Sequence, residues 1–325
     1  MDKVALIIII FCMCLMTVFQ VTCDELKEVV ETKLHLCPGL YCGRIVPEAQ
    51  CGACPRGYQP DDQSLCVRCT GHLMLYDQLY LGFMALLSLV LHWFFIEFTT
   101  RRKKRVIILH LCALIESVLA AVLTLVMSDP MGSLNIRSCS VRHLSDWYTL
   151  LYNPSINYTT TLHCTQEMVY PLYSMVMIYY SLSLIFLLIT RTFVSYKFVE
   201  SRGTKSIYAA LYFLPILIVV QAVFGGLLYY AFPYIILVVS VVTSAIHLAS
   251  MKDQNIKDLI IDSFTSVRNL TILVGHWILH AYGIISLTEL KNPSFELPLL
   301  ALVPFPALFY VLTVRCSNPD ELDHV

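Results

Sequence analysis

Seven long apolar stretches, separated by short polar gaps, constrain this chain more than any other feature of its sequence. A helix needs roughly 20 mostly apolar residues to cross the hydrocarbon core of a bilayer, and each stretch has about that length. The stretches cover residues 76–98, 106–127, 168–190, 207–228, 231–250, 270–288 and 297–314. Composition agrees, because 57% of residues are hydrophobic and only 14% are charged. The sequence therefore predicts an all-α polytopic membrane protein, with seven transmembrane helices over residues 76–314.

Basic residues gather in alternate gaps and predict the orientation of these helices. The sharpest cluster is the run Arg101, Arg102, Lys103, Lys104 and Arg105. The basic gaps are 99–105, 191–206, 251–269 and the tail 315–325, and they hold thirteen Lys and Arg against three in the opposite gaps. Because short loops rich in Lys and Arg stay in the cytosol, we expect a cytosolic C-terminus and a luminal N-terminal segment. Nothing in the charge pattern suggests a nucleic-acid partner.

Residues 1–23 have the pattern of a signal peptide, with a short charged start, sixteen apolar residues and a small-residue cleavage site. The alternative is an uncleaved anchor, which would add an eighth span. Both interpretations place the following segment in the lumen.

Residues 24–75 form a predicted luminal domain that is rich in cysteine. Six cysteines fall within 33 residues: Cys37, Cys42, Cys51, Cys54, Cys66 and Cys69. Two Cys-x-x-Cys pairs have the spacing of zinc ligands, and a redox-active dithiol is a third interpretation, although it lacks a thioredoxin-like context. Because a secreted domain this small cannot build a sufficient core, we expect three disulfides instead.

The predicted luminal loop, residues 128–167, carries two more cysteines and a glycosylation sequon. Cys139 and Cys164 would close 26 residues if they bridged, and two buried thiols are the alternative. The sequon Asn157-Tyr158-Thr159 requires luminal exposure, which the charge pattern predicts independently.

Few ionisable residues lie inside the predicted spans. The main candidates are Glu116, His276 and His280, and His276 and His280 are one helical turn apart. They could share a metal ion, but histidines hydrogen-bonded between helices are commoner. Glu116 is the stronger functional candidate, because burying charge in lipid costs at least about 2–3 kcal/mol. We find no catalytic constellation and therefore expect no enzymatic activity, no cofactor and no bound metal.

Glycine, aromatic residues and proline predict where the spans bend. The segment 224–233 predicts a tight turn between the fourth and fifth spans. Pro215, Pro304 and Pro306 lie inside predicted spans and should kink them.

Several long strings in this chain resemble the JNK-associated membrane protein (JAMP) family. They lie at 75–77, 79–85, 89–97, 136–139, 144–149, 151–155, 205–213, 225–234, 276–277, 280–286 and 297–304. One of them reads Leu-Tyr-Leu-Gly-Phe-Met-Ala at 79–85. The resemblance covers about residues 37 to 310, and the chain departs from the vertebrate pattern at its N-terminus and in the gaps 191–205 and 251–269.

The resemblance implies a seven-span protein of the endoplasmic reticulum membrane. Such a protein recruits proteasome subunits and membrane RING-type ubiquitin ligases for degradation of misfolded proteins (ERAD) during the unfolded protein response. The resemblance also implies a link to the duration of c-Jun N-terminal kinase signalling, and no enzymatic activity. The alternative is a heptahelical receptor or a small-solute transporter, which the luminal cysteine-rich segment and the kinked spans would also suit.

Overall fold

The computed structural model describes residues 36–100, 106–132, 136–154, 162–198, 204–251 and 254–317. The chain divides into two compact units. The small unit contains residues up to Gly71 together with Arg137–Pro171, and the helical unit contains His72–Ile136 and Leu172–Val325. The predicted signal peptide, the basic run from Arg101 to Arg105, the sequon at Asn157 and residues 318–325 lie outside the described residues.

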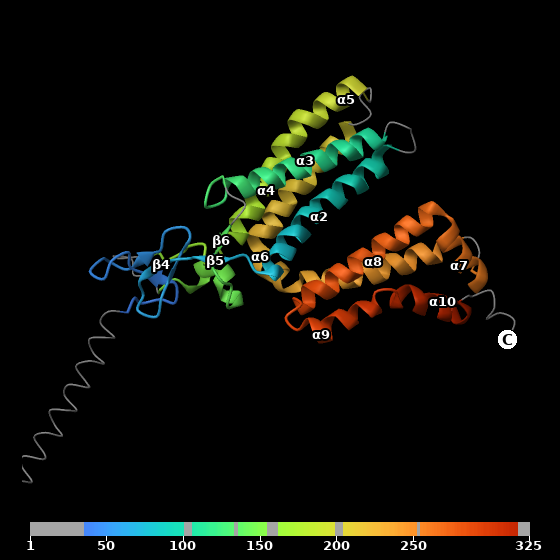
Figure 1. Cartoon of the computed structure of the whole chain (residues 1–325). Helices are drawn as coiled ribbons and strands as arrows, with labels where there is room; N and C mark the ends of the chain where they lie inside the picture. The colour runs from blue at the N-terminus through green and yellow to red at the C-terminus, as the bar shows by residue number, and fades with distance from the viewer. Residues whose placement is uncertain are drawn as a thin grey trace, which may run out of the picture. The chain divides into compact units, whose positions relative to one another are not determined.

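The small unit is built from short strands and turns (Figure 1). Strand β1 (Cys42–Gly43) pairs with β2 (Gly52–Ala53), and β3 (Tyr58–Pro60) pairs with β4 (Cys66–Arg68), both antiparallel. The remaining elements are β5 (Gly71–His72), β6 (Arg137–Ser138) and the 3-10 helices η1 (Leu144–Trp147) and η2 (Thr149–Tyr152). Strands this short bury little apolar surface, so the unit depends on covalent bonds.

Four disulfides hold the small unit together and join its two segments. They are Cys37–Cys51, Cys54–Cys66, Cys42–Cys164 and Cys69–Cys139. The predicted set of three bridges within 24–75, and the predicted Cys139–Cys164 bridge, were therefore wrong. All eight cysteines are oxidised, which leaves no thiolate for zinc. Neither Cys-x-x-Cys pair bridges its own two cysteines, as a redox dithiol of that motif would.

The two predicted luminal segments also share buried polar contacts, which explains why they form one unit. The buried Asp146 carboxylate accepts the Tyr41 hydroxyl at 2.9 Å and the backbone N–H groups of Arg142 and His143 at 2.9 Å each. Burial raises the pKa of Tyr41 above its ordinary value, so the phenol stays protonated and donates. The segment 24–75 thus completes its core with loop residues.

The helical unit consists of long apolar helices (Figure 1). In chain order they are α2 (Leu75–Thr100), α3 (Val106–Met127), α4 (Leu172–Phe186), the π-helical η3 (Leu187–Arg191), α5 (Thr192–Phe198), α6 (Thr204–Ala249), α7 (Ile256–Thr265), α8 (Val267–Thr288), α9 (Pro293–Glu296), the 3-10 helix η4 (Leu297–Leu302) and α10 (Phe305–Ser317). Among the described residues, six helical segments are long and apolar enough to cross a membrane. The predicted all-α polytopic membrane fold is confirmed.

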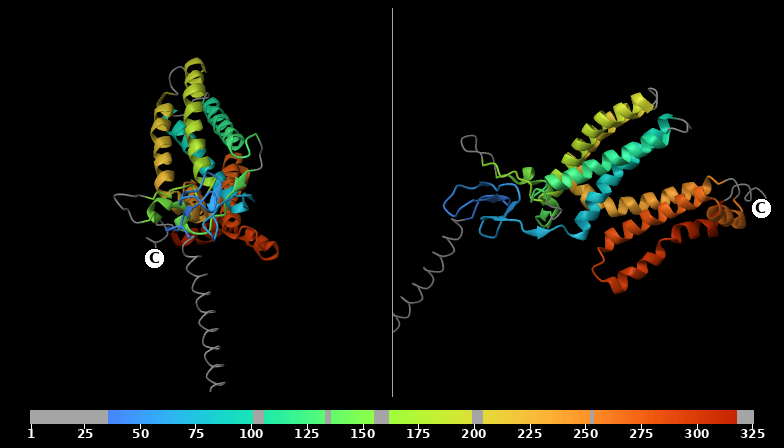
Figure 2. Two further views of the ribbon diagram at one scale, coloured as in Figure 1. Left: turned by 90° about the vertical axis from the view of Figure 1, so that its left-hand side faces the viewer. Right: turned by 45° about the horizontal axis from the view of Figure 1, so that its top comes forward.

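The count of six differs from the predicted seven because α6 contains two of the predicted spans. Its 46 residues would extend about 70 Å at 1.5 Å per residue, more than twice the roughly 30 Å hydrocarbon core. Figures 1 and 2 show that α6 changes direction, so that one part runs beside α2 and α4 and another beside α8. The predicted tight turn at 224–233 was wrong, because helical structure continues through it.

The structure differs from the sequence-based prediction at two other span boundaries. The third span runs without a break from Leu172 to Lys197, so that residues 191–197, predicted to be a cytosolic gap, are helical. In the seventh span, α10 begins only at Phe305, after Pro304, with Pro306 in its first turn. Proline lacks the N–H that a helix interior requires, so these two prolines start a helix instead of kinking one.

Candidate functional site: buried polar clusters between the helices

A buried ion pair joins α3 to the end of η3. Arg191 donates from Nη2 to Glu116 Oε2, and the two side chains are 0% and 2% exposed. The Thr190 hydroxyl donates to the other carboxylate oxygen, Oε1, at 2.6 Å. Both oxygens of the carboxylate therefore accept hydrogen bonds, and the pair brings no net charge into the helix bundle.

Two further side chains complete this cluster. The Cys112 thiol donates to Glu116 Oε1 at 3.2 Å, and His92 Nδ1 lies 3.2 Å from Arg191 Nη1. Because a guanidinium group only donates, His92 Nδ1 is the acceptor and its ring proton is on Nε2. The His92 ring also packs edge-on against Phe213, with centroids 4.9 Å apart.

The sequence identified Glu116 but missed its partner. Arg191 follows the third apolar stretch directly, so the positive-inside pattern assigned it to a cytosolic gap. The π-helical segment instead carries it into the bundle. A carboxylate within a span does predict a nearby cation. The sequence offers several Lys and Arg at helix ends, however, and does not indicate which one lies beside Glu116.

A second cluster lies between α2 and α6, where Pro233 interrupts the helical hydrogen bonds. Proline cannot donate to the carbonyl four residues earlier, which here belongs to Tyr229. The Tyr76 hydroxyl donates to that carbonyl at 2.7 Å. The Tyr229 hydroxyl in turn donates to Asp77 Oδ1 at 2.7 Å, and the Tyr76 and Tyr229 rings meet edge to face at 5.0 Å. The buried Asp77 is thus satisfied within the helical unit.

The two predicted histidines contact hydroxyl groups of α6. His280 Nδ1 lies 2.8 Å from the Ser240 hydroxyl, and His276 Nδ1 lies 3.2 Å from the Thr243 hydroxyl. The nearby His247 ring is 6.2 Å from that of His276. Within the part of the chain that the structure describes, no group of three or more His, Cys, Asp or Glu side chains is arranged to hold a metal ion.

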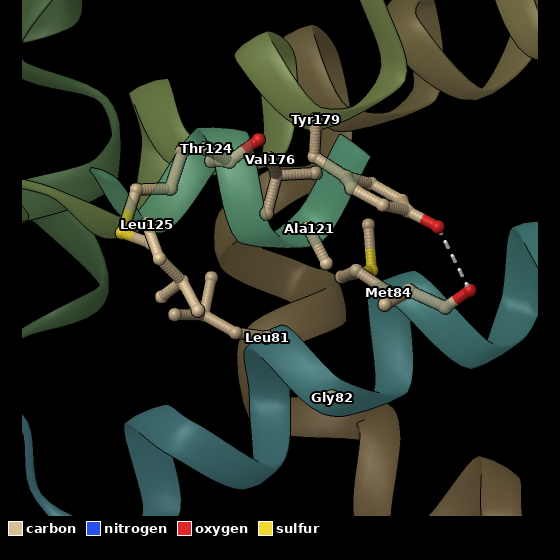
Figure 3. A pocket seen from close by; sticks show the side chains of 10 residues that line it. Leu81, Gly82, Met84, Ala121, Thr124, Leu125, Val176 and Tyr179 are labelled. Atoms are coloured by element: carbon tan, nitrogen blue, oxygen red, sulfur yellow. Dashed lines mark hydrogen bonds between the residues drawn. The ribbon is translucent and has the colours of Figure 1, made fainter. Parts of the chain in front are cut away.

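A small apolar pocket of about 190 Å³ lies between α2, α3 and α4 (Figure 3). Its labelled lining includes Leu81, Met84 and Val176, and it carries two hydroxyl groups. The Tyr179 hydroxyl donates to the Ala85 carbonyl at 3.3 Å, and the Thr124 hydroxyl donates to the Ala120 carbonyl at 2.7 Å. Both hydroxyls are therefore used within the fold.

Comparison of the sequence with known proteins finds similarity along both the small unit and the helical unit. A sequence profile for the JNK1/MAPK8-associated membrane protein family, JAMP, matches residues 37–319. The chain belongs to the JAMP family. It is 50% identical to the human and 49% identical to the mouse JNK1/MAPK8-associated membrane protein, in each case over 88% of this chain and 95% of the relative. A homologue from Caenorhabditis elegans is 34% identical over 83% of this chain and 84% of the relative. No solved structure matches.

For this member of the JAMP family, the structure brings some of the predicted residues together and keeps others apart. Glu116 lies with Arg191 and His92, while His276 and His280 lie on α8 against α6. The two sets involve different helices, and each uses its polar atoms in contacts between helices.

Proposed function

We propose that this chain is a non-enzymatic adaptor of the endoplasmic reticulum membrane. It recruits proteasome subunits and membrane RING-type ubiquitin ligases for degradation of misfolded proteins. It also associates with c-Jun N-terminal kinase and modulates the duration of stress signalling. The observation that carries the proposal is the 50% identity with human JNK1/MAPK8-associated membrane protein over 95% of that relative.

The character of the buried polar groups supports a role without catalysis. In the described residues, the Glu116 carboxylate, the Asp77 carboxylate and the Nδ1 atoms of the two α8 histidines all make hydrogen bonds within the helical unit. Side chains that act on substrates usually face a cleft with a poised nucleophile, acid or base. These polar groups instead join helix to helix, as a rigid scaffold requires.

The disulfides support the proposed luminal orientation of the small unit. Four disulfides persist in an oxidising compartment such as the lumen of the endoplasmic reticulum, but rarely in the cytosol. With the small unit in the lumen, the basic gaps and the C-terminal tail face the cytosol. Proteasomes, ligases and the kinase would then bind to those gaps.

Proximity labelling of the tagged, full-length protein in intact membranes tests this proposal. Labelling and affinity purification are performed with and without folding stress, and partners are identified by mass spectrometry. The proposal expects enrichment of proteasome subunits and membrane ubiquitin ligases, and stronger enrichment under stress. Recovery of heterotrimeric G proteins, or of no stable partner, would contradict it.

One observation favours a second candidate, a small-solute transporter. Ionisable residues within membrane spans often mark ion or substrate paths, and Glu116 and Arg191 form such a pair. Under this alternative, vesicles that contain the natural protein take up solute, Glu116→Gln abolishes that uptake, and neither protein binds proteasome subunits or ubiquitin ligases as partners. Under the adaptor proposal, a folded Glu116→Gln protein retains those partners.

A further inference from the structure

A larger apolar cavity, of about 380 Å³, lies between α6, α7, α8 and α10. Its walls include Leu248 of α6, Ile260 and Phe264 of α7, Leu273 of α8 and Ala307 of α10. The volume falls in the range of about 300–1,000 Å³ that is usual for small-molecule sites. The lining is apolar apart from Ser263 and the Trp277 indole, and the Ser263 hydroxyl already donates to the Leu259 carbonyl at 2.7 Å. The cavity therefore suits an apolar ligand.

The depth of the cavity matches one leaflet of a bilayer. Helix α8 begins at Val267, and Trp277 lies ten residues, or about 15 Å, along it. The last spanning segment ends at Val314, and Pro304 lies the same ten residues from that end. Since the hydrocarbon core is about 30 Å thick, the cavity covers about half of it. At this depth we expect lipid hydrocarbon to surround the mouth of the cavity.

The apolar side chains at the rim of the cavity are exposed on the surface of the helical unit. The apolar side chains of Ile260, Phe264, Leu308 and Leu312 line the rim, and they are 44%, 54%, 53% and 65% exposed. A cavity that was sealed by its own side chains would not leave its lining this accessible. An acyl chain can therefore enter from the bilayer without unfolding a helix.

Helix α7 provides the outer cover of the cavity. It has only ten residues, too few to cross a membrane. Four of its five isoleucine, leucine and phenylalanine residues share one face at helical spacing, namely Ile256, Leu259, Ile260 and Phe264, while Ile261 lies off that face. The charged residues Lys257, Asp258 and Asp262 lie outside the apolar face. Amphipathic helices of this kind lie along the membrane interface with the apolar face toward the acyl chains. The three charges sum to −1, so α7 provides no basic patch that would select an anionic headgroup.

We propose that this cavity binds one acyl chain of a membrane phospholipid. The chain enters from the leaflet on which α7 lies, and α7 packs over it. The cavity contacts the hydrocarbon tail and not the headgroup. A lipid with a zwitterionic headgroup, such as phosphatidylcholine, can therefore serve as the ligand. This site is independent of the adaptor role, because it rests only on the position of the cavity among membrane-spanning helices.

The test uses the full-length protein in detergent micelles that contain an increasing fraction of phosphatidylcholine with a photoreactive diazirine on one acyl chain. A matrix of unlabelled phosphatidylcholine is avoided, because it would compete equally with the probe and prevent saturation. After irradiation, mass spectrometry locates and counts the cross-links. We expect cross-links to Ile260, Phe264 and Leu312 to saturate as the probe fraction rises. Cross-links to Phe98 and Ile107, exposed on α2 and α3, should rise in proportion to the probe fraction. A proportional rise at all five residues would overturn the proposal.

A cavity-filling variant gives a second measurement. Ala307 is 9% exposed and lines the cavity, so Ala307→Phe should remove most of the saturable cross-linking. The matched control is Ala301→Phe, an exposed alanine in the same C-terminal segment that does not line the cavity. Saturable labelling that survives in a folded Ala307→Phe protein would contradict the proposal. If that variant does not fold, the saturation curve of the natural protein still decides the question.

Discussion

The Tyr76 hydroxyl donates to the Tyr229 carbonyl at 2.7 Å, and this is the carbonyl that Pro233 leaves without its helical donor. A side chain of α2 therefore replaces a missing backbone hydrogen bond of α6. In a bilayer an unsatisfied carbonyl is costly, because no water is available to bind it. The contact lets α6 tolerate proline where two predicted spans meet.

Tyr76→Phe should destabilise the protein by about 1 kcal/mol, because it removes this hydrogen bond and keeps the ring. In a Pro233→Ala background the same change should cost less, since alanine restores an N–H to the Tyr229 carbonyl. Equilibrium unfolding in mixed micelles measures both values. Tyr212→Phe, at a 73% exposed tyrosine, is the control. An equal cost in both backgrounds would show that Tyr76 acts through packing alone.

Glu116→Gln should destabilise the protein by about 3–5 kcal/mol, because it leaves the buried Arg191 guanidinium without a compensating charge. The double variant Glu116→Gln with Arg191→Met should recover much of that loss, since it removes the charge as well. Unfolding experiments on the single and double variants measure the coupling. Glu97→Gln, at an exposed glutamate of α2, should change little. A double variant less stable than Glu116→Gln would refute the account.

Mass spectrometry of unreduced proteolytic fragments should find Cys42 joined to Cys164 and Cys69 joined to Cys139. Both bonds tie the cysteine-rich segment to the loop after α3. Reduction before digestion is the control and should abolish the linked peptides. Recovery of a peptide that joins Cys139 to Cys164 would contradict the structure.

Asn157→Gln should remove one N-linked glycan, seen as a mobility shift that endoglycosidase treatment reproduces in the natural protein. The prediction follows from a luminal small unit, which is also where its disulfides would form. Asn269→Gln is the control, because a second sequon, Asn269-Leu270-Thr271, lies near the start of α8, at the opposite end of the spans in the proposed topology. A mobility shift with Asn269→Gln and none with Asn157→Gln would indicate the opposite orientation in the membrane.

Much of the membrane architecture follows from local sequence. The apolar stretches at 76–98, 106–127 and 270–288 correspond closely to α2, α3 and α8, because a membrane span depends on the hydrophobicity of its own residues. The prediction failed at 224–233, where glycine and proline indicated a turn. There the hydroxyl of Tyr76, 153 residues earlier than its partner Tyr229, satisfies the backbone and allows the helix to continue.

The sequence by itself determined that this chain spans a membrane, that the cysteines of its small unit form disulfides, and which family it belongs to. Only the tertiary structure decided which residues are partners: Glu116 with Arg191, and Cys69 with Cys139 instead of Cys139 with Cys164. Hydrophobicity and motif spacing depend on residues that are close in the chain, so they can be recognised in a single sequence. Pairing depends on how helices and loops pack in three dimensions, and the 75 residues between Glu116 and Arg191 carry no local signal of that packing.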